Sequence, residues 1–383
     1  MTMNIHADDG TLSMAEVAPK KAVRESQTAL MWRRFKRHKL ALVSLWVVIA
    51  FYLIAIFAEF LAPTDPSAYN PRYTYAPPQG INFVAVQEDG SWTFGPYVYG
   101  YKTEIDPVAL RRTFVIDETE RLPITLFAES KPYLLAGFIP MSTKLFGVSV
   151  PRAPLYVLGA DRLGRDLLSR LIHGTRISLS IGLAGVTMSL FFGIIIGGFA
   201  GYYGGWFDSA VMRVVEFIRS MPTIPLWLGL AAAMPKDWTA LQTYFAITII
   251  LSLIGWTELA RVVRGRFLSL RTEDFVTAAQ LDGASDWRII TRHMVPSFTS
   301  HIIAAATLAI PGMILAETAL SFLGLGLQAP IVSWGTLLQD AQNIRTLATA
   351  PWLLTPGICV VIIILAMNFF GDGLRDAADP HGR

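Results

Sequence analysis

Residues 271–296 read RTEDFVTAAQLDGASDWRIITRHMVP, and this polar stretch lies between two long apolar segments. Its residue types predict two short helices. Thr272 can cap the first helix, and two carboxylates follow in its first turn, where they favour the positive end of the helix dipole. Gly283 can end that helix, because glycine adopts the left-handed conformation without a Cβ penalty. Ser285 then starts a second helix, and Pro296 opens the next apolar segment. Two short helices joined at a glycine form a shape that can dock into a cleft on another protein.

The spacing of these residues resembles the EAA motif, in which Glu-Ala-Ala is followed by three residues, a glycine and a distal proline. That motif marks the integral-membrane permease subunits of ABC importers, where it forms the coupling helix that contacts the ATPase. The flanking sequences GASDWRII and RHMVP resemble the peptide/nickel (dipeptide and oligopeptide) permease subfamily. The resemblance implies a set of coupling residues: Thr277, Ala278, Ala279, Gly283, Asp286 and Pro296. Thr277 stands where the family usually has Glu, and it lacks the carboxylate that could form an ion pair with the ATPase. The alternative interpretation is an ordinary amphipathic cytoplasmic loop.

The composition indicates a membrane protein. Of the 383 residues, 53% are hydrophobic and only 16% are charged, whereas soluble domains contain about 25% charged residues. Mean hydropathy is +0.45. The net charge of +3 is too small to indicate nucleic-acid binding, and it fits positive charges on cytoplasmic loops.

The sequence also argues against several kinds of site. It contains no G-x-x-x-x-G-K-[ST], so any ATP must be bound and hydrolysed by a partner chain, and we expect no cofactor on this one. The six histidines form no H-x-x-x-H pair, which argues against a metal site. A single cysteine rules out an internal disulfide framework.

The first apolar run follows a basic cluster at residues 32–39 and covers residues 40–61. Positive charge directly before an apolar span anchors that end inside the cell. We therefore predict a cytoplasmic N-terminal tail over residues 1–38 and a first transmembrane helix over residues 39–62. A secretory signal peptide is the alternative, but the run is too long and too far from the start, and no A-x-A cleavage site follows it.

Residues 63–157 have the composition of a soluble segment, with Pro, Tyr, Gly and charges of both signs. Runs such as WTF at 92–94 and FVI at 114–116 are typical of strands, bounded by turn residues. We predict a small, β-rich extracytoplasmic insertion here. Five further transmembrane helices then form a core over residues 158–371, and residues 372–383 form a cytoplasmic C-terminal tail.

The sequence LGADRLGRD at residues 158–166 resembles a second signature of the family, GTDxLGRD, with Ala160 in place of Thr. Its candidate residues are Asp161, Gly164, Arg165 and Asp166. We expect the two aspartates to fix the start of the second transmembrane helix. The alternative is that they contact the transported solute directly.

Charged side chains inside the predicted helices mark either a transport pathway or ion pairs between helices. These candidates are Arg213, Glu216, Arg219, Glu258, Arg261 and Glu317. The first three recur at i, i+3 and i+6 and so share one helix face, for which a structural ion-pair stripe is the simpler interpretation. Glu258 and Arg261 can pair at i, i+3. Glu317 lies about 30 Å along the fifth helix from the coupling stretch, at about 1.5 Å per residue, and therefore near the outer face.

Small residues and prolines predict how the helices pack. Gly193 and Gly197 form a G-x-x-x-G face that allows close helix contact in lipid. Pro222 and Pro225 are expected to kink or interrupt the third helix, and Pro311 with Gly312 the fifth.

Together these features predict an all-α integral membrane protein with six transmembrane helices, both termini in the cytoplasm and a small extracytoplasmic insertion. The resemblance implies the type I ABC importer permease fold and a location in the bacterial inner membrane. It also implies the partners: a second homologous permease subunit, two ABC ATPase subunits, an extracytoplasmic solute-binding protein and membrane lipid. The chain itself would then be a permease subunit and not an enzyme.

Two other classes of protein are alternatives. An intramembrane enzyme would need a pattern such as G-x-S-x-G, H-E-x-x-H or paired aspartates at a common depth, and the sequence has none of these. A secondary transporter should show two matching sets of interrupted helices and no EAA-like loop. The substrate stays open, because the subfamily implies di- or oligopeptides, while relatives with a large first extracytoplasmic loop also carry oligosaccharides or other modified solutes.

Overall fold

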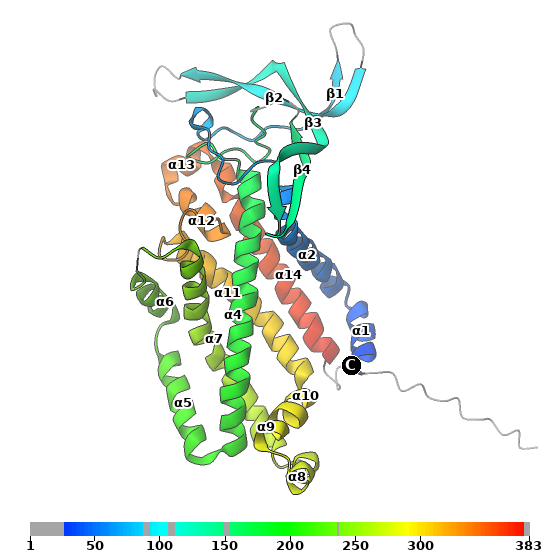
Figure 1. Cartoon of the computed structure of the whole chain (residues 1–383), viewed down its shortest axis with the longest axis vertical. Coiled ribbons are helices and arrows are strands. Elements are labelled where there is room, and N and C mark those ends of the chain that lie inside the picture. The colour runs from blue at the N-terminus through cyan, green and yellow to red at the C-terminus, as the bar shows by residue number, and fades with distance from the viewer. Residues whose placement is uncertain are drawn as a thin grey trace, which may run out of the picture.

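The computed structural model describes residues 27–86, 92–105, 112–148, 150, 153–235 and 237–378. In this part of the chain, long helices form a bundle with a small antiparallel sheet at one end (Figure 1). Two short helices, α8 (Asp274–Leu281) and α9 (Asp286–Arg288), lie at the opposite end. Helix α1 (Gln27–Arg37) and the end of the last helix also lie towards the end that carries α8.

Five helical segments among the described residues are long and apolar enough to cross a membrane. They are α2 (Lys39–Ile56), α4 (Leu167–Tyr203), α7 (Ala240–Leu270), α11 (Thr299–Phe322) and α14 (Thr355–Ala378), the last together with the preceding turn Pro351–Leu354. The sequence predicts six. The remaining predicted span corresponds to α5 (Gly205–Ser220) and α6 (Thr223–Ala232), which both pack against α7.

The break between α5 and α6 has a local cause. Pro222 has no N–H to continue the helical hydrogen bonds, and it disfavours the helical conformation of the residue before it. Met221 is accordingly extended, with ψ of 139°. Pro222 therefore interrupts this helix as predicted, whereas Pro225 lies within the first turn of α6 and does not interrupt it. Neither half alone is long enough to span a bilayer of about 30 Å.

Short elements connect the long helices. They are α3 (Ala58–Leu61), a turn at Pro71–Tyr73, a π-helical turn at Ile289–Met294, α10 (Val295–Ser297), α12 (Trp334–Gln339), a turn at Asp340–Gln342 and α13 (Ile344–Thr349).

Helices α4 and α7 approach each other through glycines. A Cβ added at Gly193 would lie 2.6 Å from the Cβ of Leu259, and one at Gly201 would lie 2.6 Å from the Cβ of Phe267. Between them, Gly197 faces the backbone of Ala260 at even closer range. The predicted G-x-x-x-G contact is therefore confirmed. Because the contacts advance in the same direction along both helices, α4 and α7 run parallel.

Replacing Gly193 with leucine is expected to separate α4 from α7 and to lower the thermal stability of the purified protein. Overpacking of a filled interface costs about 1–3 kcal/mol, and packing is a main driving force for helix association in lipid. Gly312→Leu is the matched control, because no atom lies within 4 Å of a Cβ added at Gly312. Equal melting temperatures for the Gly193 variant and the unmodified protein would contradict this contact.

The sheet lies within the interval 63–157 and follows the order of the chain. Its antiparallel strands are β1 (Asn82–Val86), β2 (Trp92–Ile105), β3 (Arg112–Leu135) and β4 (Ile139–Val148). Val98, Leu122 and Leu155 form a small apolar core beneath it. A second cluster, which includes Tyr101 and Tyr156, joins the sheet to the loop before α4. The sheet is thus attached to the bundle at the start of α4.

Two helices extend further without interruption than the sequence predicts. Helix α11 runs through Pro311 without interruption, although Pro311 and Gly312 were expected to break it. Proline is tolerated inside a membrane helix where neighbouring helices and local adjustments compensate for the lost hydrogen bond. The last helix continues to Ala378, past the predicted boundary at residue 371. Gly371 and Gly373 allow this, because their missing side chains leave room for Leu308 and Ala41.

Candidate functional site

The first short helix of the 271–296 stretch ends at the predicted glycine turn. Gly283 has a φ of +73°. Its N–H donates to the carbonyl of Gln280 at 3.0 Å, and the N–H of Ala284 donates to the carbonyl of Ala279 at 3.0 Å. These two hydrogen bonds are the Schellman arrangement of a helix C-terminus. They fix the angle at which the chain leaves α8.

The starts of the two helices are set by different residues. Glu273 occupies the N-cap of α8, one residue after the predicted Thr272, and its side chain makes no capping bond. Ser285 caps α9 as predicted, since its side chain accepts a hydrogen bond from the backbone of α9. The chain then continues through the π-helical turn Ile289–Met294 into α10, which contains Pro296.

One side of this stretch is buried against the helix bundle. The apolar cluster there consists of Val263, Phe267, Val276, Ala279, Ile289, Ile290, Met294, Phe298 and Ile302. Its members come from α7, α8, the π-helical turn, the first turn of α11 and the N-cap residue of α11, Phe298. Close-packed interiors transmit displacement, so α8 cannot move far without moving the adjacent ends of α7 and α11.

The stretch is also fastened to the end of α4. The Asp286 carboxylate accepts hydrogen bonds from the hydroxyls of Tyr202 at 2.9 Å and Tyr203 at 2.8 Å. The ring of Trp287 stacks on Phe199, with ring centroids 6.0 Å apart. Neither tyrosine was identified from the sequence, because nothing in the pattern of α4 indicates which residue its C-terminal turn will contact.

The other side of α8 presents an exposed apolar face, of which only Ala278 was predicted from the sequence. Phe275, Ala278 and Leu281 recur at i, i+3 and i+6 and therefore share a face. All three are exposed, and Leu281 is 84% exposed. Thr277 is exposed beside them, and its hydroxyl bonds to the carbonyl of Glu273. Large apolar side chains gathered on an exposed surface mark contact with another protein. Their i, i+3, i+6 spacing is the sequence pattern from which this face could have been predicted.

The predicted 161–166 loop is a tight turn that also bonds to the backbone of Asn70 and Tyr75. Asp161 is buried, and its carboxylate accepts hydrogen bonds from the N–H of Leu163 at 2.8 Å and of Arg165 at 3.0 Å. It also pairs with the Arg165 guanidinium at 2.6 Å. Gly164 has a φ of +68°, and a Cβ there would collide with the backbone of Asn70.

Asp166 caps the N-terminus of α4. Its carboxylate accepts hydrogen bonds from the N–H groups of Leu168 at 3.2 Å and Ser169 at 2.9 Å. Burial raises the pKa of Asp166 to about 6, against the opposing effect of these hydrogen bonds. Both aspartates therefore hold the start of α4, as expected. Their oxygens are engaged within the protein, which argues against direct solute contact.

The charged residues of α5 and α7 form ion pairs both between the two helices and within α5. Arg219 on α5 pairs with Glu258 on α7, so Glu258 does not form the predicted pair with Arg261. The side-by-side packing of α5 and α7 brings the arginine of another helix to this carboxylate. Arg213 and Glu216 lie 3.5 Å apart and are both exposed.

Glu317 on α11 is fully buried. Its carboxylate accepts hydrogen bonds from the hydroxyls of Ser321 at 2.8 Å and Ser178 at 3.1 Å. Ser178 in turn accepts a hydrogen bond from the N–H of Trp334 at 3.1 Å. Ionisable groups at membrane depth are costly unless they have such partners. Glu317 thus joins α4, α11 and α12 and does not face an open pathway.

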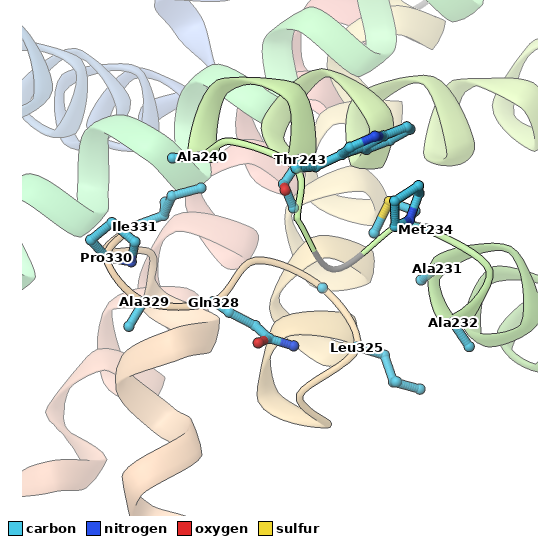
Figure 2. A pocket seen from close by; sticks show the side chains of 13 residues that line it. Ala231, Ala232, Met234, Ala240, Thr243, Leu325, Gln328, Ala329, Pro330 and Ile331 are labelled. Atoms are coloured by element: carbon cyan, nitrogen blue, oxygen red, sulfur yellow. The ribbon is translucent and has the colours of Figure 1, made fainter.

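A pocket of about 490 Å³ lies between the C-terminal end of α6, the N-terminal end of α7 and the loop that follows α11 (Figure 2). Alanines and other apolar side chains dominate its lining, together with the polar groups of Thr243, Gln328 and Trp238. None of the six charged candidates lines it, and the described residues that line it include no ionisable side chain. The pocket can offer apolar contact and hydrogen bonds, but these residues supply no acid–base chemistry.

Residues 193–383 match the family described as "Binding-protein-dependent transport system inner membrane component", and residues 26–78 match the "N-terminal TM domain of oligopeptide transport permease C". The oligopeptide transport system permease protein OppC of Bacillus subtilis is 36% identical over 255 residues, which cover 64% of this chain and 81% of that protein. The dipeptide transport system permease protein DppC of Lactococcus lactis is 32% identical over 356 residues, covering 91% and 89%. The chain belongs to the binding-protein-dependent transport permeases.

This membership confirms the resemblance drawn from the EAA-like spacing, and it makes the chain an integral inner-membrane protein. The two matched regions leave residues 79–192 between them, and this interval contains the sheet. Among solved structures, chains of the MetNI methionine ABC transporter in inward-facing conformations align over 55% of this permease and 97% of their own length, with 22% identity and a TM-score of 0.42.

Proposed function

We propose that this permease is the transmembrane subunit of an ATP-driven, binding-protein-dependent ABC importer for di- or oligopeptides. The observation that carries the proposal is the 271–296 stretch. It is buried on one side against α7 and α11, fastened to α4 through Asp286, and free on the side that presents Phe275 and Leu281. The peptide substrate rests on the names of the relatives, which are oligopeptide and dipeptide permeases.

ATP is bound and hydrolysed by two partner ATPase subunits in this proposal, and the exposed face of α8 docks on one of them. When the ATPases approach each other, α8 and α9 follow. The apolar cluster and the two tyrosine hydroxyls transmit that displacement to α4, α7 and α11. A second homologous permease completes the pathway, and the bundle rocks between inward- and outward-facing states. The 490 Å³ pocket supplies weak contacts for the passing solute.

Six membrane crossings, with both termini in the cytoplasm, form part of this proposal. Because α4 and α7 run parallel, the chain must return across the membrane between them, and α5 with α6 supplies that crossing as a discontinuous helix. Basic residues gather on α1 and in the last ten residues of α7, at positions 261, 264 and 266, which favours a cytoplasmic position for both. Residues 63–157 then lie outside.

Cysteine labelling should place the sheet and α8 on opposite sides of the membrane. In a Cys359→Ala background, Glu118→Cys on β3 should react with a membrane-impermeant maleimide in spheroplasts. When the permease is expressed without its ATPases, Leu281→Cys on α8 should react only after the membrane is permeabilised, because both positions are then exposed and differ only in compartment. Labelling of both cysteines in intact spheroplasts would contradict the six-crossing topology.

Uptake by the reconstituted importer tests the function itself. The permease, its partner permease, the ATPases and the binding protein are combined in proteoliposomes, and labelled tripeptides and oligosaccharides are offered separately. We expect ATP-dependent accumulation of the peptide. Accumulation of the oligosaccharide alone would assign the other substrate class, and no ATP-dependent uptake of either would remove the support for an importer.

The solute-binding protein docks at the sheet end in this proposal. Trp92 and Phe94 lie two residues apart on β2, so they share one face of the strand, and both are largely exposed. Figure 1 shows β1 and β2 at the far end of the molecule from α8.

Phe94→Asp is expected to reduce the stimulation of ATPase activity by loaded binding protein, because it places a charge in an apolar contact. Basal ATPase activity should be unchanged, since Phe94 lies in the sheet and away from the helices. Glu118→Ala on the same sheet is the control. Stimulation equal to that of the unmodified permease would exclude this docking face.

A further inference from the structure

The hairpin that joins β3 to β4 has an unusually apolar turn. Residues 134–140 read LLAGFIP and include no polar or charged side chain. Hairpin turns are ordinarily rich in Asn, Asp, Ser and Gly. The other two intervals between strands of this sheet do include charged residues, since residues 87–91 read QEDGS and residues 106–111 read DPVALR.

The apolar side chains of this turn are not buried in the protein. Phe138 is 73% exposed, Leu134 is 53% exposed and Ile139 is 45% exposed. Ala136 and Gly137, both at positive φ, form the turn itself. Three large apolar side chains gathered at an exposed tip indicate contact with an apolar phase or partner.

The outer boundary of the membrane can be located on the adjacent helices. Residues 40–58 contain no charged side chain, and Lys39 and Glu59 flank them. At about 1.5 Å per residue this interval spans about 30 Å, which is the thickness of a hydrocarbon core. Glu59 pairs with Arg176 of α4 at 2.6 Å, and Arg176 also donates to the carbonyl of Ala55 at 2.7 Å. This ion pair marks the boundary on the sheet side.

The hairpin turn docks at that boundary. The N–H of Ala136 donates to the Glu59 carboxylate at 3.4 Å. Ala136 also lines a surface hollow together with Tyr52, Ile56 and Leu183, all of which belong to membrane spans. Tyr52 is seven residues before Glu59, or about 10 Å deeper along the helix. The turn therefore reaches the lipid-facing surface of α2 and α4, and Figure 1 shows the end of this hairpin beside the top of α2.

We propose that Leu134, Phe138 and Ile139 insert into the leaflet on the sheet side of the bilayer. Their apolar surface continues the lipid-facing surface of α2 and α4, so phospholipid is the occupant that the position favours. The sheet is then held by lipid at one corner and by the loop before α4 at another. This fixes its orientation relative to the membrane. The proposal needs only the membrane crossings, and it is independent of the substrate and of the direction of transport.

Spin labelling measures the depth of the turn directly. In a Cys359→Ala background, Phe138→Cys carries a nitroxide, and the full-length permease is placed in nanodiscs of phosphatidylethanolamine and phosphatidylglycerol. Collision with oxygen, which concentrates among acyl chains, is compared with collision with a water-soluble nickel chelate. Glu118→Cys, exposed on β3, is the control in water. We expect the label at 138 to favour oxygen, with several-fold less access to nickel than the label at 118.

Two outcomes would overturn the proposal. Equal access to nickel at positions 138 and 118 would mean that the turn lies in water. Low access to both reagents at position 138 would mean that protein covers it. Leu134→Cys provides a second position that should report the same depth. Adding Phe138→Asp to Leu134→Cys should raise nickel access several-fold, because the charged turn leaves the lipid, and unchanged access would also count against insertion.

Discussion

Replacing Gly283 with valine is expected to uncouple ATP hydrolysis from uptake while the helix bundle stays intact. Gly283 has a φ of +73°, and no atom lies within 4 Å of a Cβ added there. The substitution therefore meets no clash, and its cost is the left-handed backbone alone. That cost is about 1–2 kcal/mol for a residue with a Cβ, and more for a β-branched one. Since about 1.4 kcal/mol is a factor of ten in population, the native exit from α8 should become roughly tenfold less favoured.

The loss of coupling follows from the orientation that the Gly283 turn gives to α9. Its two hydrogen bonds aim α9 and so place Asp286 against Tyr202 and Tyr203. When that orientation is lost, α8 can still follow the ATPase, but its direct polar link to α4 is reduced to the hydrogen bond that Gln280 donates to the Tyr202 hydroxyl at 3.2 Å. Peptide transported per ATP in proteoliposomes should fall, by at most roughly tenfold, while the yield and melting temperature of the complex stay normal.

Two control variants make the measurement specific. Gly283→Asn should preserve coupling, because asparagine tolerates the left-handed conformation better than other residues with a Cβ. Thr277→Ala should have little effect, because the Thr277 side chain is exposed and bonds locally to the carbonyl of Glu273. Normal coupling in Gly283→Val would show that this turn does not set the link between ATPase and permease.

Leu281→Asp is expected to release the ATPase subunits from an otherwise folded permease. Leu281 is 84% exposed, so a charge there leaves the core intact. In the docked state the same charge would be desolvated against an apolar contact. Loss of a central apolar anchor costs at least about 2 kcal/mol, which corresponds to roughly 30-fold weaker binding. Titration of the ATPase onto the permease in nanodiscs measures this directly.

Ile344→Asp is the matched control for this experiment. Ile344 is an apolar residue that is 82% exposed on α13, and α13 lies near the sheet end of the molecule. ATPase affinity should be unchanged in this variant. Equal weakening by both substitutions would indicate a general effect of surface charge, and full affinity of Leu281→Asp would rule out the exposed face of α8 as the docking surface.

Much of the candidate site could be predicted because it depends on local chemistry. Gly283 ends α8 and Ser285 caps α9 because of backbone conformation and hydrogen bonding within a few residues. The aspartates of the 161–166 loop bond to N–H groups no more than four residues away. In each case the residue type and its immediate neighbours in the sequence are enough to specify the contact.

The partners of the same residues could not be predicted in this way. Asp286 bonds to tyrosines more than eighty residues earlier in the chain, and Glu258 pairs with Arg219 of another helix. Phe275 and Leu281 were overlooked for a related reason. An apolar residue at helical spacing faces either the core or a partner protein, and the packing of Val276 and Ala279 against α7 and α11 determines which.

The apolar runs, the interruption at Pro222 and membership of the permease family are properties of the sequence. A span needs only length and hydrophobicity, and a proline acts on its own helix. The parallel contact of α4 with α7, the burial of Glu317 among serines and the docking of the β3–β4 turn against Glu59 depend on the fold. These contacts join segments that are far apart in the chain. The register between two such segments is set by how all of the elements pack together, and the pattern of either segment alone does not specify it.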